Sequence, residues 1–369
     1  MAEYQRPSSR DDFEIAIICA LPRELDAVCL LFDDKPGDEP GDKPGDKHGR
    51  VHNDYNQYET GRIGSFHVVV VPLETMGSVS SGSATTALRI SYPNIKIALV
   101  VGVCGAIPKL GDNNIRCGDV IISKSVFQHD YGRQNPDSFE IKDSTEGGLG
   151  PATKDIRNLL AIIQSERGLE RLKSRTTTAL KQLQTKATSD RWQIPQVKND
   201  GLMEAANSFT PAIFFGPIAS GNAVIKSAEH RDKLAKENGA VAFEMEGAGV
   251  WPELPCLVVK GVCDYADVNK QKNWQDFAAA TAAAAAKAIL QQYIQSDKPV
   301  RAGVSVPTTA TQDGSKYTET VKGVKVEQGN EMDVRSSQPP RNYLQKGSAF
   351  GSQVDATGDV RQGNKMSFS

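Results

Sequence analysis

The chain has 369 residues, with 43 Lys and Arg against 45 Asp and Glu and a formal net charge of -2 at pH 7. This length suits one large core with appendages. The balanced charge provides no overall field toward nucleic acid or anionic membrane, so we expect neither as a partner. No run of 18 apolar residues occurs, and residues 1–14 resemble neither a signal peptide nor a transit peptide. We therefore expect a soluble, cytoplasmic protein.

Several common kinds of site are disfavoured by the residues that the chain lacks. The six cysteines never form a CxxC pair and lie mostly in apolar runs, as expected for reduced core thiols. The five histidines are scattered and form no HExxH pattern. GxGxxG after the first strand, GxxxxGK[ST] and GxSxG are also absent. We expect no metal and no other cofactor, and a hydrolase that works with acidic side chains is the leading interpretation.

The composition changes at two places, which predicts the domain boundaries. Residues 33–50 repeat Pro-Gly-Asp three times, a pattern that neither a helix nor a strand can use, so they are predicted to be a flexible insertion. Residues 297–369 are rich in Ser, Thr, Gly and Gln and poor in large aliphatic residues, which predicts disorder in isolation. Residues 1–12 are predicted to be a flexible N-terminus. The remaining segment, 13–296, is the predicted domain.

Short apolar runs alternate with helical patterns through this domain. Because the runs are continuous rather than alternating, they predict strands of a sheet that is covered on both faces, and hence an α/β fold. The predicted strands are 14–21, 66–73, 95–105, 119–126, 212–220, 240–247 and 255–264. The predicted helices are 22–31, 80–91, 153–186 with a break at Gly168, 226–238 and 274–295, the last rich in alanine and expected to close the domain.

Acidic residues follow three of the predicted strands, where ligands of open α/β sheets bind. Glu24 begins a helix after the first strand, although a surface glutamate that complements the helix dipole would look the same. Glu244 and Glu246 flank Met245 in FEMEG. Either at least one of them faces a cleft, or both are ordinary residues of an edge strand. Asp264 ends the most apolar strand, either as a buried functional acid or as an ordinary helix cap. Glycines in VVGVCGAIP (100–108) and IASGNAV (218–224) would allow a ligand to approach the backbone.

The motifs ALPRE, VVGVCGAIP, SGNAVIKS, FEMEGAG and KGVCDYAD occur in this order along most of the predicted domain. The set resembles the nucleoside phosphorylase and nucleosidase superfamily, over roughly residues 13–295. The nearest likeness is the methylthioadenosine/adenosylhomocysteine nucleosidase-like domain of fungal NLR-type immune proteins. The resemblance implies a mixed central sheet flanked by helices in a three-layer domain, and a purine nucleosidase that breaks an N-glycosidic bond.

The resemblance also implies roles for individual residues. Asp264 matches the acid that protonates purine N7, which requires the acid to carry or share a proton. Glu246 matches the carboxylate that accepts the ribose hydroxyls, and Met245 the residue that packs on the sugar. Glu24 matches the residue that orients and deprotonates water. Val224 and Ile225 match positions that sandwich and read the base, although an aromatic residue is usual at Val224.

Other matching positions are less regular. Cys104 and Gly105 stand in the GxCG turn of the superfamily, beside the expected base site. Cys263 stands where nucleosidases often have Ser beside the acid, which leaves the orientation of Asp264 open. Relatives of this branch remove adenine from ATP or related nucleotides as immune effectors, so a 5′-triphosphate is a candidate substrate. Arg133 in the loop VFQHDYGRQ and Lys226, with the basic residues Arg171, Lys173 and Arg175, are the candidate phosphate ligands.

Two alternative functions remain open from the sequence. A nucleoside phosphorylase would use phosphate instead of water, and phosphorylases of this superfamily resemble GDPxR after the first strand and have Arg before the GxCG turn. This chain has LPRE and VVGVCG, which favours water, although Arg23 remains a candidate phosphate ligand. A catalytically silent binding or assembly module is the other alternative.

The tail has a short repeat of its own. VEQGNEM (326–332) and VRQGNKM (360–366) share five residues at an offset of 34. Such segments can stack in cross-β assemblies, although chance similarity in a low-complexity segment explains them equally well. We expect a homo-oligomer, and a tail (298–369) that is dispensable for catalysis but needed for assembly or signalling.

Overall fold

The computed structural model describes residues 6–34, 48–142, 149–195, 209–270 and 272–294, and four strands beyond them. The chain divides into two compact units, Met1–Gln295 and Ser296–Ser369. Residues 35–47 of the predicted insertion lie outside the described residues. Within the described part of the chain, no helix is both long and apolar enough to cross a membrane.

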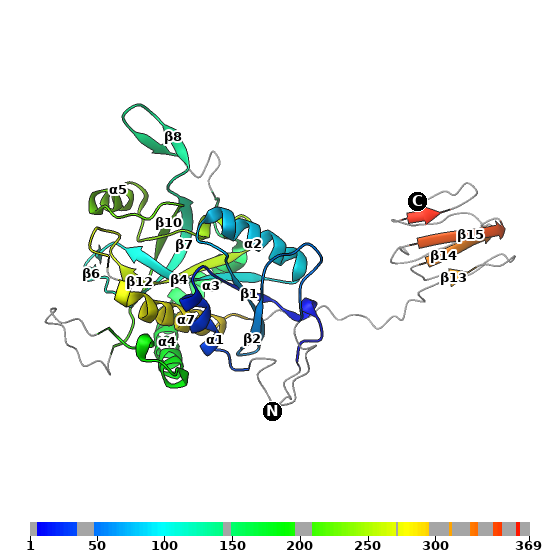
Figure 1. Ribbon diagram of the computed structural model, residues 1–369, viewed down its shortest axis with the longest axis horizontal. Coiled ribbons are helices and arrows are strands. Elements are labelled where there is room, and N and C mark those ends of the chain that lie inside the picture. Colours follow the sequence, from blue (N-terminus) through cyan, green and yellow to red (C-terminus); the bar gives the residue numbers. More distant parts are fainter. Residues whose placement is uncertain are drawn as a thin grey trace. The chain divides into compact units, whose positions relative to one another are not determined.

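The first unit is built on an eight-stranded mixed sheet (Figure 1). Its strands, in the order β11-β10-β7-β12-β4-β1-β3-β2, include all seven that were predicted from apolar runs. The unpredicted strand is β2, whose sequence ETGRI is largely polar and which pairs antiparallel with β3 at the edge. The bounds are β1 Ile15–Cys19, β2 Glu59–Ile63, β3 Phe66–Pro72, β4 Ile97–Ala106, β7 Val120–Gln128, β10 Ile213–Ser220, β11 Ala242–Glu244 and β12 Cys256–Asp264.

Part of this sheet closes on itself. Strand β11 pairs in parallel with β10 and also antiparallel with β4, with Phe243 opposite Gly105. Strands β11, β10, β7, β12 and β4 therefore form a ring, and closing a sheet in this way requires strongly tilted and twisted strands. The closure brings the end of β11 beside β4 and β12, although β11 is at the far end of the strand order.

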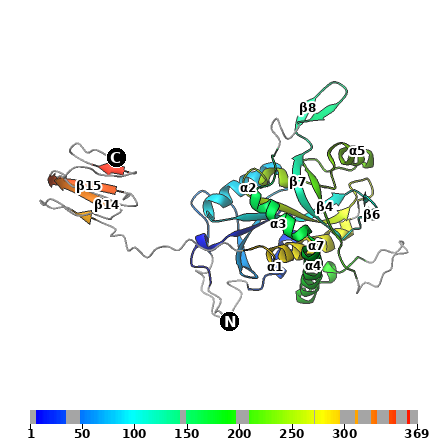
Figure 2. The same cartoon turned by 180° about the vertical axis from the view of Figure 1, so that it is seen from behind.

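Helices flank the sheet, which confirms the predicted mixed α/β architecture (Figures 1 and 2). The most buried is α7, an alanine-rich helix that packs on β12 and β4 on one side and on α4 and α1 on the other. Its small side chains allow this close double packing. The helices are α1 Pro22–Leu30, α2 Ser78–Ser91, α3 Lys154–Gln164, α4 Glu166–Lys186, α5 Ala228–Asn238, α6 Gly247–Val250 and α7 Gln275–Leu290, with 3-10 turns at Arg10–Asp12, Asp190–Trp192 and Lys272–Trp274.

The predicted helix break at Gly168 is wrong. The break lies at Ser165, which ends α3 and caps α4 by accepting a hydrogen bond from the Gly168 N–H. A Cβ at Gly168 would lie 1.9 Å from the carbonyl oxygen of Ile162. Glycine is therefore needed because the two helices meet closely, and it lies inside α4 rather than between the helices.

Two small hairpins extend from the sheet. One pairs β5 (Lys109–Leu110) with β6 (Asn113–Asn114), and the other pairs β8 (Gly132–Gln134) with β9 (Phe139–Ile141). Figures 1 and 2 both show the β8 hairpin projecting beyond β7, on the opposite side of the unit from α1, α4 and α7.

The second unit contains a four-stranded parallel sheet, in the order β13-β14-β15-β16. The strands are β13 Ala310–Thr311, β14 Lys325–Asn330, β15 Asn342–Ser348 and β16 Asp359–Arg361. The predicted disorder of this segment in isolation stays a prediction.

We predict that Gly261→Ala destabilises the first unit. A Cβ at Gly261 on β12 would lie 1.9 Å from the carbonyl oxygen of Ala278, so α7 would have to shift. Overpacking of this kind costs about 1–3 kcal/mol, measurable as a lower midpoint of chemical denaturation. The control is Gly82→Ala in α2, where the nearest atom lies 3.4 Å away and alanine is the better helix former. Equal midpoints for the two variants would contradict this account of the packing.

Candidate active site

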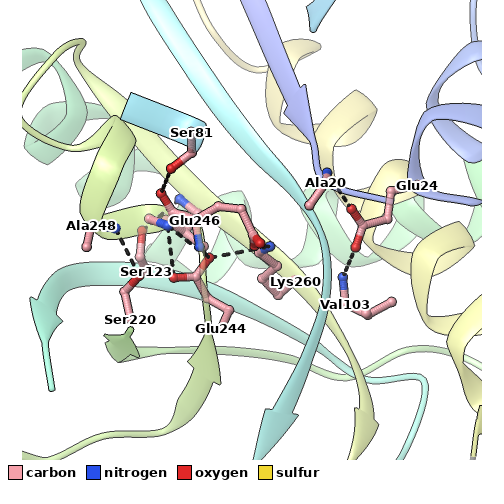
Figure 3. Close-up of polar contacts among 12 residues, drawn as sticks. Ala20, Glu24, Ser81, Val103, Ser123, Ser220, Glu244, Glu246, Ala248 and Lys260 are labelled. Carbon is pink, nitrogen blue, oxygen red and sulfur yellow. Dashed lines mark hydrogen bonds and ion pairs between the residues drawn. The ribbon is translucent and has the colours of Figure 1, made fainter. Parts of the chain in front are cut away.

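A buried lysine lies at the centre of the site. Lys260, in the middle of β12, is 1% exposed. Its Nζ lies 2.8 Å from Oε2 of Glu246 and 3.4 Å from Oε2 of Glu244 (Figure 3). The sequence analysis did not single it out. The available signal was a lysine inside the apolar run LVVKGVCD, because a buried charge requires a counter-charge.

The two glutamates of FEMEG have different contacts. The carboxylate of Glu244 accepts the backbone N–H groups of Glu246 and Gly247 at 3.1 and 3.0 Å, so it holds the turn into α6. The backbone oxygen of Glu246 accepts a hydrogen bond from Ser81 Oγ, and Met245 between the glutamates is half-buried. Of the interactions found among the described residues, none uses Oε1 of Glu246, the oxygen not bonded to Lys260. Glu246 thus retains an acceptor for a ligand, whereas Glu244 has a structural task.

Glu24 approaches the same lysine from α1, and its charge acts on Lys260. It is the third residue of α1, and its carboxylate accepts the N–H groups of Ala20, Leu21 and Val103 at 2.8–2.9 Å. A Cβ at Gly102 would lie 2.3 Å from Glu24 Oε1, so only glycine leaves room for this carboxylate. Glu24 is 2% exposed and is not the surface residue of the alternative interpretation.

One buried ammonium thus pairs with two buried carboxylates, and the charge of a third, Glu24, also acts on it. Burial alone would lower the pKa of Lys260, but the charges of the nearby glutamates outweigh it and raise the pKa above the ordinary lysine value. Burial raises the pKa of Glu24 and of Glu244, and the ammonium only partly opposes this rise. The lysine therefore stays charged, while Glu24 and Glu244 take up protons more readily than exposed glutamates do.

Asp264 ends β12 opposite Gly105 in the register. Its Oδ1 accepts the Ala266 N–H at 2.8 Å and forms an ion pair with Lys270 at 3.2 Å. Cys263 donates its thiol to Oδ2 and to the carbonyl oxygen of Cys104, each at 3.4 Å. Burial raises the pKa of the Cys263 thiol, which keeps it a donor. Cys263 therefore supports the orientation that the sequence left open, and Lys270 is a contact that the sequence analysis missed.

The expected base-binding residues fall into two groups. Cys104 and Gly105 lie beside Asp264, where a Cβ on Gly105 would come within 2.9 Å of the carboxylate. Val224 is 51% exposed and Ile225 is buried, in the loop between β10 and α5. The loop is fixed by Asn222, which joins Asp130, after β7, to Ser78, at the start of α2. These hydrogen bonds hold the loop after β10 to the segment after β7 and to the start of α2.

The expected phosphate ligands are more dispersed. Arg133 is exposed on the β8–β9 hairpin, and Lys226 is exposed just before α5. Arg171, Lys173 and Arg175 lie on α4, where Arg175 donates to the carbonyl oxygen of Gln291 beyond α7. Arg23 pairs with Asp276 at 2.9 Å, so this candidate phosphate ligand already has an acidic partner.

Among known relatives, the chain is 33% identical to an NLR-like protein of Hyaloscypha variabilis, over 78% of this chain and 30% of that protein. It thus spans less than a third of that relative. A 5′-methylthioadenosine/S-adenosylhomocysteine nucleosidase of Mycobacterium bovis is 24% identical, over 75% of this chain and 95% of the enzyme. A death domain-containing ATP nucleosidase of Amphimedon queenslandica is 26% identical, over 51% of this chain and 32% of that protein.

Solved structures show the same fold. The crystal structure of the Helicobacter pylori 5′-methylthioadenosine/S-adenosylhomocysteine nucleosidase, in complex with a substituted pyrrolidin-3-ol, superimposes with a TM-score of 0.53, at 19% identity, over 76% of this chain and 99% of that one. The family model of the phosphorylase superfamily matches residues 14–295, which comprise every acid described above. This chain therefore belongs to the phosphorylase superfamily.

Proposed function

We propose that the chain is a purine nucleosidase that hydrolyses the N-glycosidic bond of an adenine nucleoside or nucleotide. The observation that carries the proposal is the convergence of Glu24, Glu246 and Asp264. They come from opposite ends of the first unit's sequence. The ring closure and the packing of Glu24 and Asp264 against β4 bring them to one end of the sheet. Two of the three curated relatives described above are named as nucleosidases, which supports hydrolysis as the reaction class.

Each acid has a separate task in such a reaction. Cleavage passes through an oxocarbenium-like state, in which positive charge develops on the ribose while the base leaves. Oε1 of Glu246 accepts ribose hydroxyls, and Lys260 fixes the carboxylate through Oε2. Asp264 delivers a proton to purine N7, and because Lys270 occupies its Oδ1, a purine that takes its proton from this oxygen displaces Lys270. Glu24 accepts a proton from the attacking water.

Water is favoured over phosphate as the nucleophile. Phosphorolysis needs a cation set for inorganic phosphate, and the only candidate from the sequence motifs, Arg23, is paired with Asp276. A phosphorylase remains the alternative, and analysis of the reaction products distinguishes it from a nucleosidase.

We further propose ATP as a candidate substrate, giving adenine and ribose triphosphate. The similarity to an ATP nucleosidase supports this choice, and Arg133 and Lys226 are the candidate phosphate ligands. Similarity to an NLR-like protein supports a role as an immune effector. A catalytically silent module would bind the nucleotide and release no base.

The function is tested by incubating the full chain with ATP, ADP, AMP, adenosine and methylthioadenosine and measuring free adenine by chromatography, with and without phosphate. We expect release from at least one compound without phosphate and a product with a free anomeric hydroxyl. Asp264→Asn should lower turnover about 10²- to 10⁴-fold with an unchanged melting temperature, because an amide is too weak an acid to transfer a proton to N7. Ribose 1-phosphate as the product would establish phosphorolysis. If no compound released adenine, the alternative of a catalytically silent binding module would be supported.

The acid limb of the pH profile should report Glu24. Glu24 must be ionised to accept a proton. Because burial raises its pKa, Glu24 becomes protonated and activity falls at a higher pH than for an ordinary glutamate, whose pKa is about 4.3. Its contribution to stability has the opposite sign, since a folded-state pKa above the unfolded value means that acidification through this window favours the folded state. Profiles of kcat/KM and melting temperature against pH test both signs. An acid limb at or below the pH of an ordinary glutamate would contradict the assignment.

Removing the central cation should affect stability and catalysis together. Lys260→Met leaves buried carboxylates unpaired, and we expect a loss of about 3–5 kcal/mol in the free energy of unfolding. Lys260→Met with Glu246→Gln should recover part of this stability but not turnover, because Glu246 would no longer be a carboxylate. The matched control is Lys287→Met, another buried lysine, which bonds the Leu31 carbonyl oxygen and Asp33. That variant should lose stability while its folded fraction keeps its kcat/KM.

A further inference from the structure

The loop after β12 brings a lysine onto the acid that is proposed to protonate the base. Lys270 lies between β12 and α7, and its Nζ is 3.2 Å from Oδ1 of Asp264. The chain bends at Ala266, whose φ of 52° lies in the left-handed region, and the Asn269 N–H donates to Oδ1 of Asp267 at 2.8 Å. These two features turn the loop back, so that the lysine returns to the acid at the end of the strand.

The start of this loop is held in place from two sides. Arg231 of α5 donates to the carbonyl oxygen of Tyr265 at 2.8 Å, and the Tyr265 hydroxyl donates to the carbonyl oxygen of Ile115 at 3.1 Å. The side chain of Lys270 is 25% exposed and that of Asp264 is 11% exposed, so the pair lies below the surface but within reach of a ligand. The lysine is therefore placed beside the acid by the fold of the loop.

The hydrogen bonds at Asp264 show which of its atoms can meet a base. Each carboxylate oxygen has two lone pairs, and those of Oδ1 are used by the Ala266 N–H and by Lys270. Among the described residues, Oδ2 accepts only the weak thiol donor of Cys263, at 3.4 Å. Oδ2 is therefore the oxygen available to purine N7. A group that meets N7 with one atom presents its second atom to the C6 substituent, as Asn does with adenine, and Lys270 occupies that second place.

Adenine and the 6-oxopurines differ at this edge of the ring. Adenine presents an acceptor, N7, and a donor, the amino group at C6, whereas guanine presents two acceptors, N7 and O6, and hypoxanthine shares its 6-oxo group. A protonated carboxyl group offers one donor and one acceptor, so Asp264 alone matches adenine. With Lys270 on the acceptor oxygen, the pair offers two donors, and these match N7 and O6 of a 6-oxopurine.

We propose that Lys270 gives the site a second class of substrate, the nucleosides or nucleotides of 6-oxopurines, by donating a hydrogen bond to O6. The inference rests on the proposed hydrolysis and extends it beyond adenine. The C1′–N9 bond breaks and its electron pair goes to the purine, while Asp264 gives its proton to N7. Water adds hydroxide to C1′ and gives a proton to Glu24. Lys270 keeps its protons and stabilises the electron density that develops on O6, whereas adenine requires it to leave Oδ1.

Substrate pairs that differ only at C6 test the proposal on the full chain. Adenosine is compared with inosine, AMP with IMP and ATP with ITP, and kcat/KM for release of the free base is measured by chromatography. We expect hypoxanthine from at least one of the 6-oxo compounds. Release of adenine without hypoxanthine from any of them would overturn this inference and leave the proposed hydrolysis standing. No base from either class would overturn both.

Substitution of the lysine identifies the group that reads C6. Lys270→Met should lower the ratio of kcat/KM for the 6-oxo compound to that for its adenine counterpart about 5- to 100-fold, the range for one such contact. Lys270→Arg should keep most of the ratio, because a guanidinium also donates to O6. The matched control is Lys272→Met, which removes an exposed cation from the adjacent 3-10 turn and should leave the ratio unchanged. An unchanged ratio in Lys270→Met would exclude this role.

Binding of the free bases gives a measurement that does not depend on turnover. Calorimetric titrations with hypoxanthine and with adenine should show that Lys270→Met weakens hypoxanthine binding by a similar factor without weakening adenine binding. An equal loss of affinity for both bases would indicate that Lys270 only supports the loop, and it would overturn the proposal.

Discussion

The site depends on one buried ion pair, that between Lys260 and Glu246. A lysine in the interior of a strand is costly unless a counter-charge lies within hydrogen-bond distance, and here the distance is 2.8 Å. The pair holds together β12 and the turn after β11, and Glu244 holds that turn by accepting the N–H groups at the start of α6. Removing the cation would leave several carboxylates without compensation. The geometry of Glu246, the acid proposed to bind the ribose, is thus tied to the stability of the whole unit.

The second constraint is close backbone approach at two glycines. Glu24 and Asp264 both lie against strand β4, with Gly102 against the first carboxylate and Gly105 against the second. A methyl group at Gly102 would take the space of the Glu24 carboxylate, and one at Gly105 would contact Asp264 at 2.9 Å. The two acids can therefore both lie against this one strand only because these positions have no side chain. The superfamily turn GxCG has a steric explanation in this fold.

Much of this arrangement follows from sequence, and the exceptions have physical causes. Continuous apolar runs predicted seven strands because those strands are buried on both faces. Strand β2 was not predicted, because it lies at an edge of the sheet and its sequence ETGRI is largely polar. The acids were found because each lies at the end of a strand or within a few residues after it. The ring closure was not predictable, since β11 is very short and its partner β4 lies far away in the sequence. Lys260 was missed because it was read as part of an apolar run.

The different environments of Glu24 and Asp264 support the different roles proposed for them, as the base for water and the acid for the leaving purine. Glu24 is enclosed, and backbone N–H groups fix both of its oxygens, which suits a group that holds a water in one place. Asp264 lies nearer the surface, with 11% of its side chain exposed, and its partners include the long side chain of Lys270. A leaving base can compete with such a side chain but not with a strand backbone. An acid that meets the base at each turnover is therefore expected at Asp264, and the fixed base for water at Glu24.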